Sequence, residues 1–179
     1  MMNTASGASG RAISIAEAGR GLDLARGGLK VLIENTAGAE FSLGGTFEQV
    51  AELIELLWRT VSVGACIDTC HVHVAGYDIV SEEGLSRTLE QLDETIGLHR
   101  VKVWHCNDAK APQGSKLDRH EHIGKGMIGK ETFRKLLNDP RLAHAAFIAE
   151  TPIDRPGDDH RNVEALKKLV GEQWPGGRG

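Results

Sequence analysis

The sequence has few aromatic residues and lacks any long apolar run. Aromatic side chains make up 4% of the 179 residues, yet 40% are hydrophobic, so one ordered core is possible and disorder throughout is excluded. No apolar stretch approaches the roughly 20 residues that a membrane-spanning helix needs. The start, MMNTASGASGRA, has no apolar segment of the kind found in a signal peptide. We therefore expect a cytoplasmic globular protein that does not contact a membrane.

Cysteine is also rare, and the three that are present, Cys66, Cys70 and Cys106, exclude two common uses of thiols. An odd number without a CxxC pair argues against a disulfide framework and against a thiolate zinc finger. We expect all three side chains to be reduced thiols.

Charge of one sign is not in large excess, because 21 basic and 25 acidic residues leave a net charge of −4. This balance disfavours a protein that coats nucleic acid without specificity. The sum hides an asymmetry, since residues 100–135 carry nine basic against four acidic side chains, a local charge of +5. Such a segment is typical of a surface that faces phosphate groups, and equally of a solvated helix and loop.

Apolar spacing predicts four units in which a strand is followed by a helix, with one further helix over 13–29 before them. Thr46 and Gln49 have the spacing of a capping box at the start of a helix, and Gly97 is placed to end another. A long polar loop is expected after the third strand, up to about Gly129. The predicted strands cover Lys30–Glu34, Val63–Asp68, Arg100–His105 and Ala145–Glu150, and the later helices cover 46–58, 85–96, 133–137 and 163–169.

Strands and helices in alternation indicate a parallel sheet with helices outside it. Two architectures fit, a doubly wound open sheet and a partial (β/α)8 barrel, because a whole barrel needs about 250 residues and twice as many strands. We expect a flexible leader over 1–12, one domain over 13–173 and a flexible tail over 174–179.

Each predicted strand ends in a residue that can bind a metal, namely Glu34, Asp68, His105 and Glu150. The carboxyl ends of parallel strands form one rim, so these side chains converge if their strands are neighbours. Burying three carboxylates and an imidazole together costs several kcal/mol unless cations compensate for the charge. The pattern therefore predicts a divalent metal at this rim.

Further metal-ligand types lie close to these strand ends in the sequence. His71 follows Asp68 by three positions, and Asp118 and His120 lie in the long loop. Mixed sets of histidine and carboxylate suit zinc or manganese, and the number of candidates exceeds what one ion uses. Two or more metals are expected, and multinuclear sites of this kind favour hydrolysis of phosphate esters.

Other possible ligands are given weaker roles. Cys70 and Cys106 lie beside ligand candidates and are kept as minor alternatives. We expect His73 to act behind the ligands or to be exposed, and we leave it out of the site together with four other histidines, His99, His122, His144 and His160.

Five segments together resemble one family. They are LIENTAG (Leu32 to Gly38), CIDTCHVHVAGYD (Cys66 to Asp78), HCNDAK (His105 to Lys110), GSKLDRHEHIGKGMIG (Gly114 to Gly129) and Glu150-Thr151. In order and spacing they resemble endonuclease IV, the zinc-dependent apurinic/apyrimidinic endonuclease family, from about Ile13 to Leu169. The resemblance implies a (β/α)8 barrel with three zinc ions that acts in base excision repair on double-stranded DNA. That family cleaves on the 5′ side of an abasic site and leaves a 3′-hydroxyl and a 5′-deoxyribose phosphate.

The resemblance also implies roles for individual residues. Glu34 matches a carboxylate that bridges two zinc ions, and Glu150 matches a ligand near the attacking hydroxide, so these two are the catalytic candidates. Asp68 and His105 match the remaining ligands of one of those ions, whereas the third ion matches His71, Asp118 and His120. Asn107 and Lys110 match positions beside the site.

The chain departs from the family in one respect. The family's barrel has four further βα units before the position of Glu34, and its first zinc takes two histidines from them, whereas no histidine precedes His71 here. The resemblance therefore covers a partial (β/α)8 barrel of about four C-terminal units. We expect self-association or a separate N-terminal half as a partner.

Two other functions remain open. A sugar isomerase or epimerase of the related barrel superfamily would explain the four strand-end residues, although it would not explain His71 or the DRH sequence at Asp118. A non-catalytic half-barrel that binds metal or a partner chain is the third possibility.

Overall fold

The computed structural model describes residues 30–171. The predicted leader over 1–12, the predicted helix over 13–29 and the predicted tail over 174–179 lie outside the described residues. Within residues 30–171, no helix has the length and apolar character needed to cross a bilayer.

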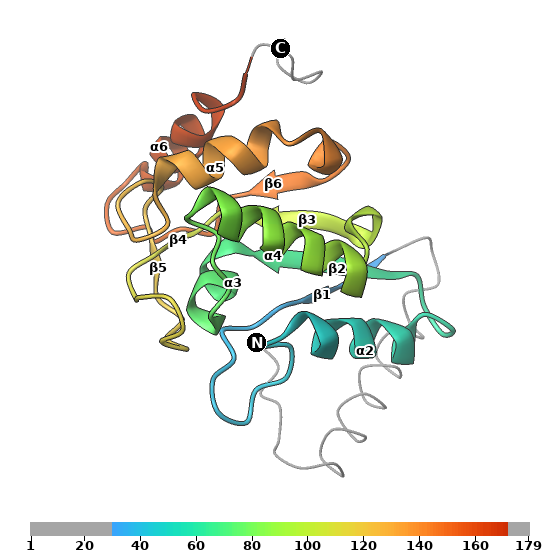
Figure 1. Ribbon diagram of the computed structural model, residues 1–179. Helices are drawn as coiled ribbons and strands as arrows, with labels where there is room; N and C mark the ends of the chain where they lie inside the picture. The colour runs from blue at the N-terminus through green and yellow to red at the C-terminus, as the bar shows by residue number, and fades with distance from the viewer. Residues whose placement is uncertain (1–29, 172–179) are drawn as a thin grey trace.

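Four parallel strands form one sheet in the order β1-β2-β3-β6, which is also their order along the chain (Figure 1). They are β1 (Val31–Glu34), β2 (Val63–Asp68), β3 (Val101–His105) and β6 (Ala146–Ile148). In the register, Asp68 lies beside His105, and the pairing of β3 with β6 ends at His105 and Ile148. The sequence therefore predicted the parallel sheet and the neighbouring positions of its strand ends.

Helices cover one face of this sheet and bury the core between the two layers. Figure 1 shows α2, α4 and α5 on the same side of the strands. The helices are α2 (Phe47–Leu57), α3 (Thr69–Ala75), α4 (Glu82–Thr95), α5 (Gly129–Asn138) and α6 (Asp158–Lys167), with short 3-10 turns at η1 (Leu98–Arg100) and η2 (Pro140–Leu142). The core contains Phe47, Ile54, Ile67, Leu92, Trp104 and Phe133, all nearly inaccessible to solvent. This layering leaves the carboxyl strand ends free to carry a site.

Helix starts follow the capping residues in the sequence. Thr46 accepts a hydrogen bond from the backbone N–H of Gln49 at 3.3 Å, as the capping box predicts. The Gln49 side chain, however, accepts from the N–H groups of Gly44 and Gly45, both at 3.0 Å, and so secures the loop before the helix. Ser81 caps α4 in the same way by accepting from Gly84 N at 3.0 Å.

Three features differ from the sequence-based expectations. The long polar loop contains a second, antiparallel sheet of β4 (Asp108–Ala109) and β5 (His120–Glu121), hereafter the ribbon. Helix α3, which begins directly after β2, was not expected. Strand β6 is shorter than predicted, so Glu150 lies two residues beyond its end. Strands β4 and β5 have only two residues each, and a strand of that length has no periodic pattern, so the ribbon could not be predicted from the sequence.

Candidate metal centre

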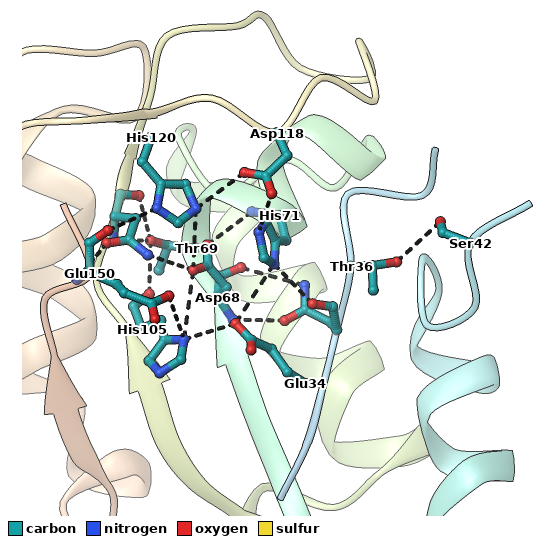
Figure 2. A network of polar contacts seen from close by, with 12 residues as sticks. Glu34, Thr36, Ser42, Asp68, Thr69, His71, His105, Asp118, His120 and Glu150 are labelled. Carbon is teal, nitrogen blue, oxygen red and sulfur yellow. Dashed lines mark hydrogen bonds and ion pairs between the residues drawn. The ribbon is translucent and has the colours of Figure 1, made fainter. Parts of the chain in front are cut away.

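The four strand-end residues meet around one imidazole nitrogen. His105 Nδ1 lies 2.8 Å from Glu34 Oε1, 3.5 Å from Glu150 Oε2 and 3.9 Å from Asp68 Oδ2 (Figure 2). One ligand atom from each of the four residues lies within 4.8 Å of the others. We call Glu34, Asp68, His105 and Glu150 the strand-end group. The structure brings this predicted set together, and its binding of a metal stays a prediction.

A second set of predicted ligands lies beside the first. His71 Nε2 lies 3.3 Å from Asp118 Oδ2, and His120 Nε2 lies 3.2 Å from Asp118 Oδ1. His71 comes from α3, His120 from the ribbon, and Asp118 from the residues just before the ribbon's second strand. We call His71, Asp118 and His120 the ribbon group. Figure 2 shows both imidazoles turned toward the Asp118 carboxylate.

Backbone contacts determine which nitrogen of each ribbon-group imidazole can bind a metal. His71 Nδ1 lies 2.9 Å from the Asn35 carbonyl oxygen, and His120 Nδ1 lies 2.9 Å from the Glu150 carbonyl oxygen. A carbonyl oxygen only accepts, so Nδ1 carries the proton in both rings. The lone pair of each neutral ring is then on Nε2, which is the arrangement found in histidines that bind metals.

The donor atoms of the ribbon group fit a divalent metal. Among residues 30–171, His71 Nε2 and His120 Nε2 are buried and make no hydrogen bond of acceptable geometry, although both face Asp118. Two lone pairs turned toward a carboxylate repel it unless a cation or added protons lie between them. Two imidazoles and a carboxylate are also a common zinc ligand set with one position left for water.

Protons take the place of a cation when no metal is bound. Burial acts to lower the pKa of His71, but Asp118 and Asp68 outweigh it and raise that pKa to about 9. Burial opposes the shift at His120 as well, yet Asp118 and Asp68 raise its pKa. Contacts with His120 and His71 hold the pKa of Asp118 well below its usual range. The ribbon group therefore takes up positive charge beside the Asp118 carboxylate, either as protons on its two imidazoles or as a metal cation.

The strand-end group shows the same demand for positive charge. Contacts with Cys66 and Glu34 raise the pKa of His105 to about 11, although burial opposes this. Burial raises the pKa of Asp68, whose side chain is fully inaccessible. A bound metal would displace protons from this group, since histidine binds metals in its neutral form.

Asp68 joins the two groups. Its Oδ2 lies 3.9 Å from His105 Nδ1 and 3.7 Å from His120 Nε2. Its Oδ1 accepts from the His71 backbone N–H at 3.1 Å and so caps α3. Asn35 Oδ1 in turn accepts from Asp68 N at 2.7 Å. Sequence reasoning missed Asn35, whose only signal is its position directly after the predicted ligand Glu34.

The cysteines lie close to the candidate ligands. Cys66 is grouped with Glu34 and His105, and Cys70 with Asp68 and His120, each within 4.8 Å. Burial, followed by the charge of Asp68, raises the pKa of Cys70 to about 12, which disfavours the thiolate that a metal requires. Cys70 was a minor alternative among the predicted ligands, whereas Cys66 was predicted only as a reduced thiol. Cys106 is buried and belongs to none of the possible ligand groups among residues 30–171.

The histidines that were left out of the site lie outside both groups. His99, His144 and His160 are exposed, as expected, and His122 Nε2 lies 3.4 Å from Asp154. His73 is only 4% exposed, so the exposed role considered for it was wrong. Both nitrogens of its ring lack a hydrogen-bond partner in the described part of the chain.

Comparison with known proteins assigns this chain to a family. The family model described as a xylose isomerase-like TIM barrel matches residues 10–170. The chain belongs to this family. Membership confirms the predicted fold, a partial (β/α)8 barrel.

Individual proteins are similar to this chain over most of its length. The chain is 48% identical over 149 residues to the probable endonuclease 4 of Solibacter usitatus, a match that covers 82% of this chain and 51% of that protein. It is 48% identical over 140 residues to the probable endonuclease 4 of Methanosphaerula palustris, with 78% and 49% covered. The crystal structure of endonuclease IV from Thermus thermophilus superposes with a TM-score of 0.74 at 37% identity, covering 87% of this chain and 55% of that one.

These matches confirm the resemblance to endonuclease IV that the motifs indicated. They also show that the chain spans about half the length of the curated relatives it matches.

Proposed function

We propose that this chain is the C-terminal half of a zinc-dependent endonuclease that hydrolyses the phosphodiester 5′ to an abasic site in double-stranded DNA, a step of base excision repair. The observation that carries the proposal is the ribbon group beside the strand-end group. Among the described residues, two buried Nε2 atoms without a hydrogen bond face Asp118, and a cation bound between them and the carboxylate would satisfy all three, in addition to any cation of the strand-end group. The similarity to proteins named endonuclease 4 supports the same reaction.

Zinc is the metal we assign, with manganese as the alternative. The strand-end group would hold one ion, with Glu34 able to bridge to another, and the ribbon group would hold one more. Bound zinc would supply a water of lowered pKa and would neutralise charge on the phosphate and on the leaving oxygen.

Exposure distinguishes the carboxylates that can act on a substrate from those that serve only as ligands. The side chains of Glu150 and Glu34 are 59% and 37% exposed, whereas that of Asp68 is 0% exposed. A phosphodiester that approaches the rim therefore meets Glu150 and Glu34, and either carboxylate can accept a proton from an attacking water. We assign these two residues as catalytic and Asp68 as a ligand.

Basic side chains around the ribbon provide counter-charge for DNA. Lys110, Lys116, Arg119 and Lys125 are exposed, and the Lys110 backbone N–H donates to the Arg119 carbonyl at 2.9 Å, which ties the two sides of the ribbon together. Cations near a rim of this kind attract phosphate groups, and that attraction weakens as salt concentration rises.

An incision assay tests the proposal. With zinc and a duplex that contains one abasic site, we expect the chain alone to give weak or no incision, because Glu34 is the single residue here that matches a ligand of the family's first zinc. A deficit of several kcal/mol in the barrier corresponds to a loss of a thousandfold or more. Adding the N-terminal half of the Solibacter usitatus relative should restore incision in part. An N-terminal half without its two ligand histidines should not.

Glu150→Gln is the control for this experiment, and the restored incision should disappear with it. Robust incision by the chain alone that is abolished by Glu150→Gln would overturn the incomplete site while supporting the family's reaction. Restored incision that survives Glu150→Gln would contradict the catalytic assignment. No incision under any of these conditions would overturn the proposal.

A second candidate is a sugar isomerase or epimerase, because the matching family model is the xylose isomerase-like one. A sugar isomerase or epimerase function leaves the ribbon group without a role. Turnover of an aldose to a ketose without incision of DNA would favour it, and metal binding with neither activity would favour a non-catalytic half-barrel.

A further inference from the structure

Asn107 lies behind the metal centre and contacts two of its members. The residue is 0% exposed and follows His105 by two positions. Its Nδ2 donates to Asp68 Oδ2 at 2.5 Å, and its Oδ1 accepts from the Glu150 backbone N–H at 2.8 Å. A single amide thus bridges a buried candidate ligand and the backbone of a candidate catalytic residue.

The orientation of this amide is determined by its partners. The Asp68 carboxylate can only accept when ionised, and a backbone N–H can only donate, so the reversed amide would lose both hydrogen bonds. The main chain of Asn107 is held as well, because its N–H donates to Thr69 Oγ1 at 2.9 Å and its carbonyl accepts from the same hydroxyl at 2.7 Å. Both the side chain and the main chain of Asn107 are therefore held by hydrogen bonds.

Glu150 has few other restraints. The ladder between β3 and β6 ends at His105 and Ile148, with one last bond from Cys106 N to the Ile148 carbonyl at 2.7 Å. Glu150 lies beyond that point, so sheet pairing does not place it. Its peptide is held by Asn107 at the N–H and by His120 at the carbonyl.

We propose that Asn107 is a positioning residue that sets the distance between Asp68 and Glu150 in the strand-end group, an inference that rests on the proposed metal site. Asp68 ends β2 and Glu150 follows β6, and these strands are separated in the sheet by β3. The amide spans that separation. Removing it releases the Glu150 backbone and leaves one oxygen of the fully buried Asp68 without its donor.

Metal affinity is the quantity that this bridge controls. Residues that orient metal ligands typically change affinity by about 10-fold to 100-fold when they are removed. The Asn107 side chain makes no hydrogen bond to the ribbon group and reaches it only indirectly, through Asp68 and the Glu150 peptide, both of which lie close to His120. The affinity of the ribbon group should therefore change less than that of the strand-end group. The inference therefore predicts a selective effect on one of two neighbouring sites.

Titration of the full chain with Co²⁺ tests this, because visible absorption of Co²⁺ reports ligand geometry. In an Asp118→Ala background only the strand-end group remains complete, and in a Glu34→Gln background only the ribbon group does. We expect Asn107→Ala to weaken Co²⁺ binding about 10-fold to 100-fold in the first background and to change its absorption spectrum. In the second background, the loss of affinity should be clearly smaller than in the first, because Asn107 reaches the ribbon group only indirectly.

Asn162→Ala is the matched control. Asn162 is 4% exposed and makes three hydrogen bonds, to Ile123 N, the Asp158 carbonyl and His122, with none to either group. It should leave the spectrum of the strand-end group unchanged. If Asn107→Ala does not fold, Asn107→Asp keeps the shape and the acceptor for Glu150 N–H while removing the donor to Asp68, and it should also alter that spectrum.

The outcomes separate the inference from the function on which it rests. An unchanged affinity and spectrum in the Asn107 variants, or an equal effect of Asn162→Ala, would overturn the positioning role while leaving the metal site in place. Failure of the Asp118→Ala chain itself to bind Co²⁺ would overturn the strand-end metal site and the inference with it.

Discussion

His120 donates from Nδ1 to the backbone carbonyl of Glu150 across 2.9 Å, although 30 positions separate the two residues. The contact joins the ribbon to the segment that follows β6. It also means that a ligand of one candidate metal is oriented by the backbone of a ligand of the other. The two groups are therefore mechanically connected, while each keeps its own set of donor atoms.

Replacing His120 by alanine should remove one metal equivalent. The ribbon group loses one of its three donors, whereas all four side chains of the strand-end group remain, and water does not replace a lost ligand at equal affinity. Elemental analysis of zinc in the purified protein measures this. His160→Ala, which changes an exposed histidine outside both groups, should retain the full zinc content. Zinc that is absent from the unaltered protein, or unchanged by His120→Ala, would contradict the assignment.

Stability should respond to pH in opposite directions with and without zinc. In the metal-free chain the pKa of His71 is raised to about 9 and that of His105 to about 11, so their contribution to stability is complete below about pH 6.5 and is lost as the pH rises. The melting temperature of the metal-free protein should fall by several degrees between about pH 6.5 and 9.

Zinc reverses this trend because it binds the unprotonated imidazoles. The stabilisation that zinc adds should grow over the same pH interval as competition from protons decreases. Differential scanning calorimetry at matched ionic strength, with and without a chelator, checks both slopes. A metal-free melting temperature that rises over this interval would be inconsistent with the raised histidine pKa values.

Asp108→Asn should destabilise the fold by about 3 kcal/mol, in the range expected when charge-assisted hydrogen bonds of a buried group are lost. The Asp108 carboxylate is 0% exposed and accepts from the N–H groups of Ala109, Gly124 and Ile128, each at 2.9 Å, and from Gly129 at 3.3 Å. An amide at this position can serve only part of that set, because its nitrogen donates.

Urea unfolding measures the loss at Asp108, with Asp93→Asn as the control. Asp93 is exposed and accepts one hydrogen bond at its side chain, from Leu98 N at 2.8 Å. Its replacement should cost about 1 kcal/mol or less. Equal losses for the two variants would show that Asp108 does not organise the loop between the ribbon and α5.

The isolated chain should associate in solution. Within residues 30–171, β1 pairs with β2 alone and β6 with β3 alone, so both edges of the sheet present unpaired backbone groups. Ile148 on β6 is 46% exposed, which adds an apolar contact at one edge. Such edges pair with other chains, and a charged side chain on the edge opposes that pairing. Light scattering should give a mass above the monomer, reduced by Ile148→Lys. A stable monomer with a cooperative melt would refute this.

The strand-end group could be predicted because its positions follow from local patterns. Runs of β-branched residues mark the strands, and the residue that ends each run is chemically distinctive, as Glu34, Asp68 and His105 show. Parallel strands place such residues on one rim without any knowledge of packing. Glu150 lies with the other three residues even though β6 ends two residues earlier.

The rest of the centre depends on contacts that no local pattern reveals. The ribbon is held by Asp108 and by the link from His120 to Glu150, which are long-range interactions. Helix α3 has the sequence TCHVHVA, whose β-branched residues suggest a strand more than a helix. Its start is imposed by the Asp68 cap. The family resemblance places Asn107 beside the site, but its contacts with Asp68 and Glu150 appear only when β2 and the segment after β6 are placed together.

The order of the strands in the sheet has a consequence for biosynthesis. Because β1-β2-β3-β6 is both the spatial and the sequential order, each strand can pair with its neighbour as the chain leaves the ribosome. Glu150 is the last of the seven candidate ligands to be synthesised. The candidate metal centre can therefore be completed only after β1, β2 and β3 have been synthesised. A nascent chain cannot present all seven candidate ligands to a metal ion before Glu150, which follows β6, has been made.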